Sequence, residues 1–265
     1  MSYRSEQVNA NLAKGAARAG EVLQLLEFWR RDGEPDPATF MQRAVQQNLL
    51  GKDSRKRASD VVRNVFGRRY FPNGSVTPGR YLAQLHESRV SREVVNLILY
   101  YHAALAERAL YLIASELIFD RHSAGYESIA TDDAVNFIEF LSTDGRADVV
   151  YSHEMKVKMA QSALTALRDF GILEGRARKR IAPVHVPHQV VAYVVHSLRD
   201  EGNSAKRIVE HDDWRLFLLT AHDVENACIE AAQYGHFGYH AAGSVRRFDW
   251  KFQSLEEYVD ALVEA

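Results

Sequence analysis

SHEMKVKMAQSALTALRDFGILEGRARKRIAPVHV, residues 152–186, is the stretch that decides the fold. Ser152 is a favourable N-cap, and Gly171 is a favourable end for the helix between them. Two short runs typical of β-strands follow, Ile172–Glu174 and Ile181–Val186, on either side of a basic tip. One face of the helix is apolar and should pack inward: Ala160, Ala163, Leu164, Leu167 and Phe170. The stretch therefore predicts the second helix of a helix-turn-helix pair, followed by a β-hairpin wing.

The outward face of this helix and the hairpin tip carry candidate contacts to nucleic acid. They are Lys156, Lys158, Gln161, Ser162 and Thr165 on the helix and Arg176, Arg178, Lys179 and Arg180 at the tip. The cations would neutralise phosphates and make binding steeply dependent on salt, whereas the uncharged polar residues are the ones that could reach bases. Winged helices also serve as protein-interaction modules, but the basic tip favours nucleic acid over that alternative.

A second basic stretch, DSRKRASDVVRNVFGRR, covers residues 53–69. Its apolar residues repeat at helical spacing and predict a helix from Ser54 to about Gly67. A helix from Pro37 to about Gln47 and a turn at Asn48–Gly51 precede it, which is a helix-turn-helix arrangement. Its candidate DNA contacts are Arg55, Lys56, Arg57 and Arg63 on the outward face, with Arg68 and Arg69 at the far end. A solvated basic face on a structural helix pair has the same pattern, so that alternative stays open.

Helical periodicity also dominates the rest of the sequence. It predicts helices at Ala17–Arg31, Arg80–Glu87, Arg92–Arg121, from Thr131 onward, His188–Arg199, Asp223–Tyr234 and Ser254–Val263, and a hairpin within Gly235–Phe252. The predicted fold class is mainly α: a multi-helix globular protein with two helix-turn-helix units, the second winged by a short β-hairpin. We divide the chain into an N-terminal helix-turn-helix region (1–75), a central helical core (76–130), a winged-helix-like unit (131–200) and a C-terminal helical extension with a small hairpin (201–265).

The overall composition is that of an ordinary globular protein, with 265 residues, 46% hydrophobic and 26% charged, and a formal net charge of −2. A near-neutral chain that gathers cations on two helices favours a polyanionic partner. Cys228 is the single cysteine, which excludes a disulfide framework or a Cys-based zinc site within one chain and fits a reducing cytosol. The most apolar stretch, Val94–Phe119, is interrupted by polar residues. We therefore expect a cytoplasmic protein with no membrane span, and a monomer, because no heptad pattern is visible.

Two segments resemble the BrxA family, whose members are accessory proteins of the BREX phage-exclusion systems of bacteria. Asn48-Leu49-Leu50-Gly51-Lys52, followed by the basic helix to Arg69, resembles the N-terminal signature of the family. Leu167–Leu173, LRDFGIL, is similar to its characteristic helix end. The resemblance spans roughly Gly15 to Leu198. It implies a mostly helical protein with helix-turn-helix elements that binds double-stranded DNA beside the methyltransferase, ATPase, phosphatase-like and protease-like components of the system.

The sequence contains no catalytic or metal-binding motif. HExxH, GxxxxGK[ST] and GxGxxG are all absent. His236 and His240 are four residues apart, but Gly235 and Gly238 disfavour the helix that would align them. His211–Asp213 lies in no recognisable ligand motif. We therefore predict a protein that is not an enzyme and needs no cofactor or metal.

The aromatic C-terminal segment, Trp214–Phe252, is interleaved with cations that would suit base stacking or partner binding, but such residues more often form the core of a small subdomain. The leading hypothesis is a double-stranded-DNA-binding accessory of a defence complex. The alternatives are a protein–protein adaptor for other defence subunits and a protein that binds helical RNA. The DNA hypothesis predicts salt-sensitive binding that weakens on neutralising Lys56 with Arg63, or Arg178 with Arg180.

Overall fold

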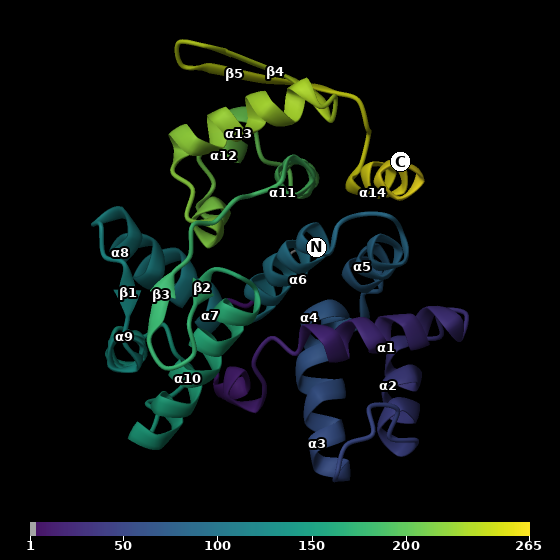
Figure 1. The fold of residues 1–265 in the computed structure, drawn as a ribbon, viewed down its shortest axis with the longest axis vertical. Helices are drawn as coiled ribbons and strands as arrows, with labels where there is room; N and C mark the ends of the chain where they lie inside the picture. The colour runs from purple at the N-terminus through teal and green to yellow at the C-terminus, as the bar shows by residue number, and fades with distance from the viewer. Residues whose placement is uncertain (1–3) are drawn as a thin grey trace.

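The structure is a computed structural model that describes residues 4–265. Within these residues it is mainly helical, with two small antiparallel sheets, one of which is a β-hairpin (Figure 1). Buried side chains from Val8 to Val259 form one contiguous hydrophobic core. The prediction of a mainly helical protein is confirmed, and the division into four regions stays a prediction.

The N-terminal part is a group of helices packed around a long basic one. Its elements are η1 (Ala10–Lys14), α1 (Ala19–Arg31), α2 (Pro37–Gln46), α3 (Arg55–Ser59), η2 (Asp60–Gly67) and α4 (Arg68–Tyr70). Pro37 lies in the first turn of α2, and the carboxylate of Asp36 caps that helix by accepting from the Thr39 amide at 3.0 Å. The last three elements form one continuous helix, 55–70, whose middle is wound as a wider π-helix. Ser54, the predicted first residue of this helix, is its N-cap and accepts from the Arg57 amide.

The central part differs from its prediction. It consists of η3 (Pro72–Gly74), α5 (Thr77–Glu87), α6 (Arg92–Ala106), α7 (Arg108–Leu112), η4 (Ile113–Ile118) and α8 (Phe119–Ser123). The prediction of one helix over Arg92–Arg121 is wrong, because the backbone is extended at Glu107 (φ −120°, ψ 92°) and the chain bends there by 111°. The break places the buried carboxylate of Glu107 3.3 Å from Nε of Arg69, which supplies the counter-charge that a buried acid needs.

No single helix in residues 4–265 is long and apolar enough to cross a membrane. The segments on either side of the Glu107 break pass that test only together, as a bent pair.

The next part of the chain forms a helix pair framed by a three-stranded sheet. Its elements are β1 (Ser128–Ile129), α9 (Thr131–Thr143), α10 (His153–Asp169), β2 (Leu173–Glu174) and β3 (Lys179–Ile181). The sheet is antiparallel with the order β1-β3-β2. The helix that Ser152 caps and the first strand agree with the prediction, but the second strand lies earlier than Ile181–Val186. Pro183, which has no N–H to donate, falls just beyond the end of that strand.

The C-terminal part covers one end of the molecule (Figure 1). It comprises α11 (His188–Asp200), α12 (Ala205–Val209), η5 (Asp212–Phe217), α13 (Ala221–Gln233), β4 (Phe237–Ala242), β5 (Val245–Trp250) and α14 (Leu255–Glu264). The predicted hairpin is confirmed, with Phe237 opposite Trp250 and Ala242 opposite Val245 across a tight turn. Trp214, Phe217 and Phe237 are buried, so these aromatic residues form core, as the sequence favoured.

Candidate nucleic-acid interface

The first basic surface lies at the start of the 55–70 helix. Arg55, Lys56 and Arg57 occupy its first turn and are exposed. Cations at a helix N-terminus are unfavourable by about 0.3–1 kcal/mol each, because the helix dipole is positive there. Helix stability therefore does not explain this placement. Arg57 is partly neutralised by Asp53 at 2.7 Å, and Arg63 is exposed further along the helix.

Cations from another part of the chain join this surface. Lys14, Arg18 and Lys52 line a hollow of about 510 Å³ together with Asp53 and Arg57. Lys14 ends η1, and Arg18 has left-handed backbone (φ 53°) just before α1. Sequence reasoning missed Lys14 and Arg18, because nothing in their local pattern shows that η1 folds back against the basic helix.

One predicted phosphate contact, at the far end of the same helix, is wrong. Arg69 is fully buried, so it is no phosphate contact. Its guanidinium donates to the carbonyl oxygens of Ala16 at 2.7 Å and Gly15 at 2.8 Å, and its Nε pairs with Glu107. Arg68 is only partly exposed and lies 3.7 Å from the same carboxylate. These two arginines connect the basic helix to η1 and to the α6–α7 break.

The second basic surface is the outward face of α10. Ser152 accepts from the Met155 amide and fixes the start of the helix. Lys158 and Gln161 are exposed, and Ser162 and Thr165 are partly exposed. Lys156 is largely covered and pairs with Glu139 on α9, so its charge is already compensated.

The turn between β2 and β3 brings cations beside α10. Gly175 has left-handed backbone (φ 84°), and a Cβ there would lie 2.2 Å from the carbonyl oxygen of Arg178. Arg176 and Arg178 are exposed at the tip. Partial burial, and then the nearby Arg168, lower the pKa of Lys179. At the base, Arg180 pairs with Glu174 at 2.8 Å across the two strands.

Residues from the tip, α10 and the start of α9 line one hollow of about 480 Å³. Five predicted contact residues meet there: Gln161, Thr165, Arg176, Arg178 and Lys179. Thr131, at the start of α9, also lines it, but the first turn of that helix carries Asp132 and Asp133, whose carboxylates already compensate the positive end of the helix dipole. This hollow is the place where a polyanion would contact helix and tip together.

The two basic surfaces are joined by η1, which contacts both α10 and η2. Figure 1 shows α3 and α10 toward the same end of the molecule, opposite the C-terminal hairpin. Seven of the predicted cations have no carboxylate within 4.0 Å in the described chain. They are Arg55, Lys56, Arg63, Lys158, Arg176, Arg178 and Lys179.

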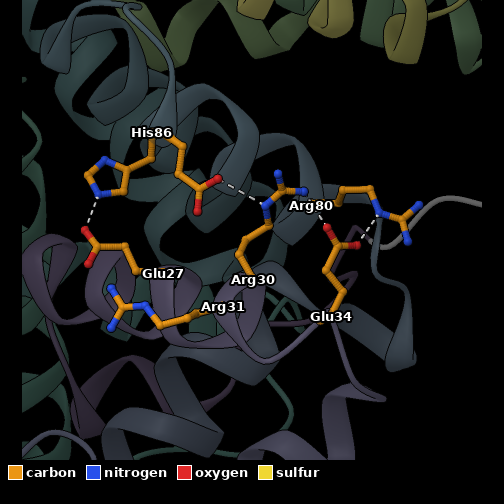
Figure 2. Close-up of a pocket in the computed structure, with 8 residues that line it drawn as sticks. Glu27, Arg30, Arg31, Glu34, Arg80 and His86 are labelled. Atoms are coloured by element: carbon orange, nitrogen blue, oxygen red, sulfur yellow. Dashed lines mark hydrogen bonds and ion pairs between the residues drawn. The ribbon is translucent and has the colours of Figure 1, made fainter.

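A further hollow has a different character. It measures about 950 Å³ and lies between α1 and α5. Figure 2 shows its charged walls: Arg30 and Arg80 both bond to Glu34, at 2.5 and 2.9 Å, and His86 bonds to Glu27 at 2.9 Å. Acidic and basic side chains alternate around this hollow and pair with one another. Its walls therefore do not carry charge of a single sign.

The described residues show little that points to chemistry. In residues 4–265 no group of three or more His, Cys, Asp or Glu side chains is placed to hold a metal ion. Cys228 is buried, and burial raises the pKa of its thiol to about 12, so it is not a reactive thiolate. His236 lies 2.6 Å from His188, whereas His240 pairs with Asp249 on the neighbouring strand. The two histidines four residues apart therefore have separate partners.

Comparison with known proteins identifies the family. The family model BrxA matches residues 6–197, which is most of the chain. The chain belongs to the BrxA family. Membership in the BrxA family implies a component of a BREX system, and it confirms the resemblance seen in the sequence. The match contains both basic surfaces and ends within α11, so most of the C-terminal part lies outside it.

The fold of this BrxA-family chain has a relative among solved structures. The crystal structure of an uncharacterized protein from Magnetospirillum magneticum covers 80% of this chain and 100% of its own, with a TM-score of 0.60 and 16% sequence identity. That similarity concerns the fold alone. No curated protein is significantly similar to the chain.

Proposed function

We propose that this BREX component is a non-enzymatic accessory protein that binds double-stranded DNA through two basic helix-turn-helix units. The observation that carries the proposal is the arrangement around α10, where unpaired cations of the β2–β3 turn stand beside the exposed polar face of a helix. The second unit would use α10 and this turn, and the first would use the 55–70 helix.

The topology of the second unit supports this assignment. A strand, two helices and a hairpin follow one another, and the first strand pairs with the last to give the order β1-β3-β2. In this arrangement α9 would be the supporting helix and α10 the recognition helix. The β2–β3 turn would be the wing, because it projects its cations next to α10.

The first unit has the equivalent helix pair without a wing. α2 packs against η2, and the turn between the pair includes Gly51 with left-handed backbone (φ 60°). The exposed start of α3 would approach the groove, flanked by Lys14 and Arg18 in place of wing cations. Ordinary helix pairs also have this form. The assignment of the first unit to DNA binding therefore depends on the cations at the start of its helix.

The two units would make different kinds of contact with DNA. The first exposes mainly arginine and lysine, which position a duplex through its phosphates. The second also exposes Gln161 and Thr165, which can donate to and accept from base edges. Sequence preference, where it exists, would therefore come from α10.

The proposal is tested by mobility-shift titration at several ionic strengths with duplex DNA, single-stranded DNA and duplex RNA of equal length. The expected result is a preference for duplex DNA and an affinity that falls steeply with salt. Binding that ignores salt would refute the phosphate-based interface. Equal or tighter binding of duplex RNA would favour the RNA-binding alternative.

One observation favours a second function, a protein–protein adaptor. Phe140, Val149 and Val150 are 52%, 56% and 74% exposed on α9 and the α9–α10 connection. Exposed apolar residues are typical of protein contacts. A chain that ignores all three nucleic acids but co-purifies with another BREX subunit, and loses it on Val150→Ser substitution, would establish the adaptor function instead.

A further inference from the structure

The backbone that connects η1 to α1 is held against the 55–70 helix by one buried side chain, Arg69. Its two terminal nitrogens donate to the carbonyl oxygens of Gly15 at 2.8 Å and Ala16 at 2.7 Å. Its Nε lies 3.3 Å from the Glu107 carboxylate. A guanidinium presents its N–H groups in a rigid planar fork, so this pairing fixes the two carbonyl groups relative to the helix. Because Arg69 is fully buried, it does not touch DNA itself.

Gly15 brings the same connection into close contact with the 55–70 helix. It is buried, and a Cβ at this position would lie 2.7 Å from Cγ2 of Val65, one turn before Arg69. Val65 is fully buried and β-branched, so its side chain has little freedom to give way. The Gly15 backbone is extended (φ −178°), so this position requires space and not an unusual conformation. A larger residue would therefore push the connection away from the helix.

Two exposed cations, Lys14 and Arg18, flank the held segment. Lys14 directly precedes Gly15, and Arg18 follows two residues after Ala16. Both line the hollow of about 510 Å³ at the start of the 55–70 helix. Lys14 has no carboxylate within 4.0 Å among residues 4–265, and Arg18 has only a long contact, 3.7 Å, to Glu21. Where the connection lies thus decides where these two charges lie.

Cations outnumber carboxylates around this hollow. Its lining contains Lys14, Arg18, Lys52 and Arg57 against Asp53 and Asp60. Lys52 is already paired with Glu21, and Arg57 with Asp53. Arg18 has left-handed backbone (φ 53°) at the N-cap of α1, where both the conformation and the positive charge are unfavourable. Local stability therefore does not explain an arginine at this position, whereas contact with a phosphate would.

We propose that Arg69 is a positioning residue for the DNA interface. By holding the η1–α1 connection, it places Lys14 and Arg18 beside the start of the 55–70 helix, where both neutralise phosphates of the bound duplex. This inference rests on the proposed function and adds two phosphate contacts to its first unit. The connection then serves the first unit as the β2–β3 turn serves the second.

The double variant Lys14→Gln with Arg18→Gln tests the two contacts. Each phosphate contact contributes about 0.9 to the slope of log K against log salt concentration, so the slope for duplex DNA should become shallower by about 1.8. The measurement is fluorescence anisotropy with a labelled duplex at five or more salt concentrations. Lys206→Gln with Arg207→Gln removes the same charge from exposed positions on α12 and should change the slope by less than about 0.5.

Gly15→Ala tests the positioning without removing a charge. Its Cβ displaces the connection from Val65, so the slope should become shallower although every cation is retained. In this background the double variant should change the slope by about 0.9 or less, half of its effect in the unmutated protein. Gly20→Ala is the matched control, because it lies in α1 beside the same cations and its Cβ meets nothing within 4 Å. It should leave the slope unchanged.

Arg69→Lys keeps a charge opposite Glu107 but lacks the fork that holds two carbonyl groups, so it should act in the same direction as Gly15→Ala. Circular dichroism reports whether each variant is folded. An unchanged slope on loss of Lys14 and Arg18 overturns the inference and leaves the proposed function standing on its other cations. Fully additive effects of Gly15→Ala and the double variant overturn the positioning role. Duplex binding of the unmutated chain that ignores salt overturns both this inference and the proposed function.

Discussion

The double substitution Lys56→Gln with Arg63→Gln should lower the salt dependence of duplex binding by a predictable amount. Both side chains are exposed on the 55–70 helix and have no carboxylate partner among the described residues. Neither makes a contact that holds the core together, so the fold should tolerate their loss. The substitution therefore removes two cations from the interface and leaves the scaffold intact.

The magnitude follows from counterion release. If each of the seven unpaired cations named above neutralises one phosphate, the slope of log K against log salt concentration is about −6. Removing two cations makes the slope shallower by about 1.8. If the two lines meet near 1 M salt, the variant binds about 60-fold more weakly at 0.1 M salt and about 20-fold more weakly at 0.2 M.

The assay is fluorescence anisotropy with a labelled duplex at five or more salt concentrations. Lys206→Gln with Arg207→Gln is the matched control, because it removes the same charge from α12, toward the opposite end of the molecule from α3 (Figure 1). The control should leave the slope unchanged within about 0.5. A slope that the first double variant does not change, or that both variants change equally, would refute the assignment of the 55–70 helix to the interface.

Three further outcomes follow from the structure. Arg69→Met should destabilise the fold by about 3 kcal/mol in urea denaturation, because it leaves the buried Glu107 carboxylate without its nearest cation and frees two carbonyl oxygens; a change below about 1 kcal/mol would contradict this role. Asp213 is buried and accepts from Arg4, and its hydrogen bonds to His211 and Arg4 outweigh burial and lower its pKa. Its contribution to stability is thus present above the ordinary aspartate pKa of about 3.9 and is lost as pH falls toward the lower folded-state value. Asp213→Asn should therefore lower the midpoint of urea unfolding most at pH 7, and the difference from the unmutated protein should shrink below pH 4; a difference independent of pH would contradict the argument. Gly175→Ala should weaken duplex binding with little change in melting temperature, since it strains only the β2–β3 turn, whereas Gly145→Ala, with a similar φ of 83° but open space around it, should leave binding unchanged.

Local signals in the sequence were sufficient for most helices. Ser152 caps the helix that it was predicted to cap, the 55–70 helix begins next to its predicted start at Ser54, and Pro37 begins its helix, because these signals act within one turn of the chain. The C-terminal hairpin was also predictable, since the Gly-rich segment supplies its turn. Such features depend on neighbours in the sequence and not on the rest of the fold.

The helix break at Glu107 could not be predicted in this way. The apolar pattern continues through it, and no proline or glycine marks it. The break goes with a contact between Glu107 and Arg69, 38 residues earlier in the chain, which local periodicity cannot reveal. The same limit applies to Lys14 and Arg18, which reach the candidate interface only because η1 packs between η2 and α10.

The error over Arg69 was avoidable from helical geometry. At about 3.6 residues per turn, Arg69 lies about 220° around the helix from Lys56, on the side of the apolar stripe. Its charge suggested an outward position, but its angular position predicted an inward one. The structure buries Arg69, although the π-helical winding over Asp60–Gly67 departs from that ideal angle, and Glu107 and two carbonyl oxygens satisfy the buried guanidinium.

The buried Arg69 also affects how two units that each bind weakly would act together on one duplex. Arg69 ties the basic helix to the residues that follow η1, and η1 itself packs against α10. The two basic surfaces are therefore held in a fixed relation by packed elements, whereas a flexible linker would leave them free to move apart. When one unit binds, a rigid connection presents the second at high effective concentration, provided that the spacing fits the duplex. Such a protein needs few strong contacts in either unit, which suits surfaces whose cations are partly neutralised by Asp53, Glu139 and Glu174.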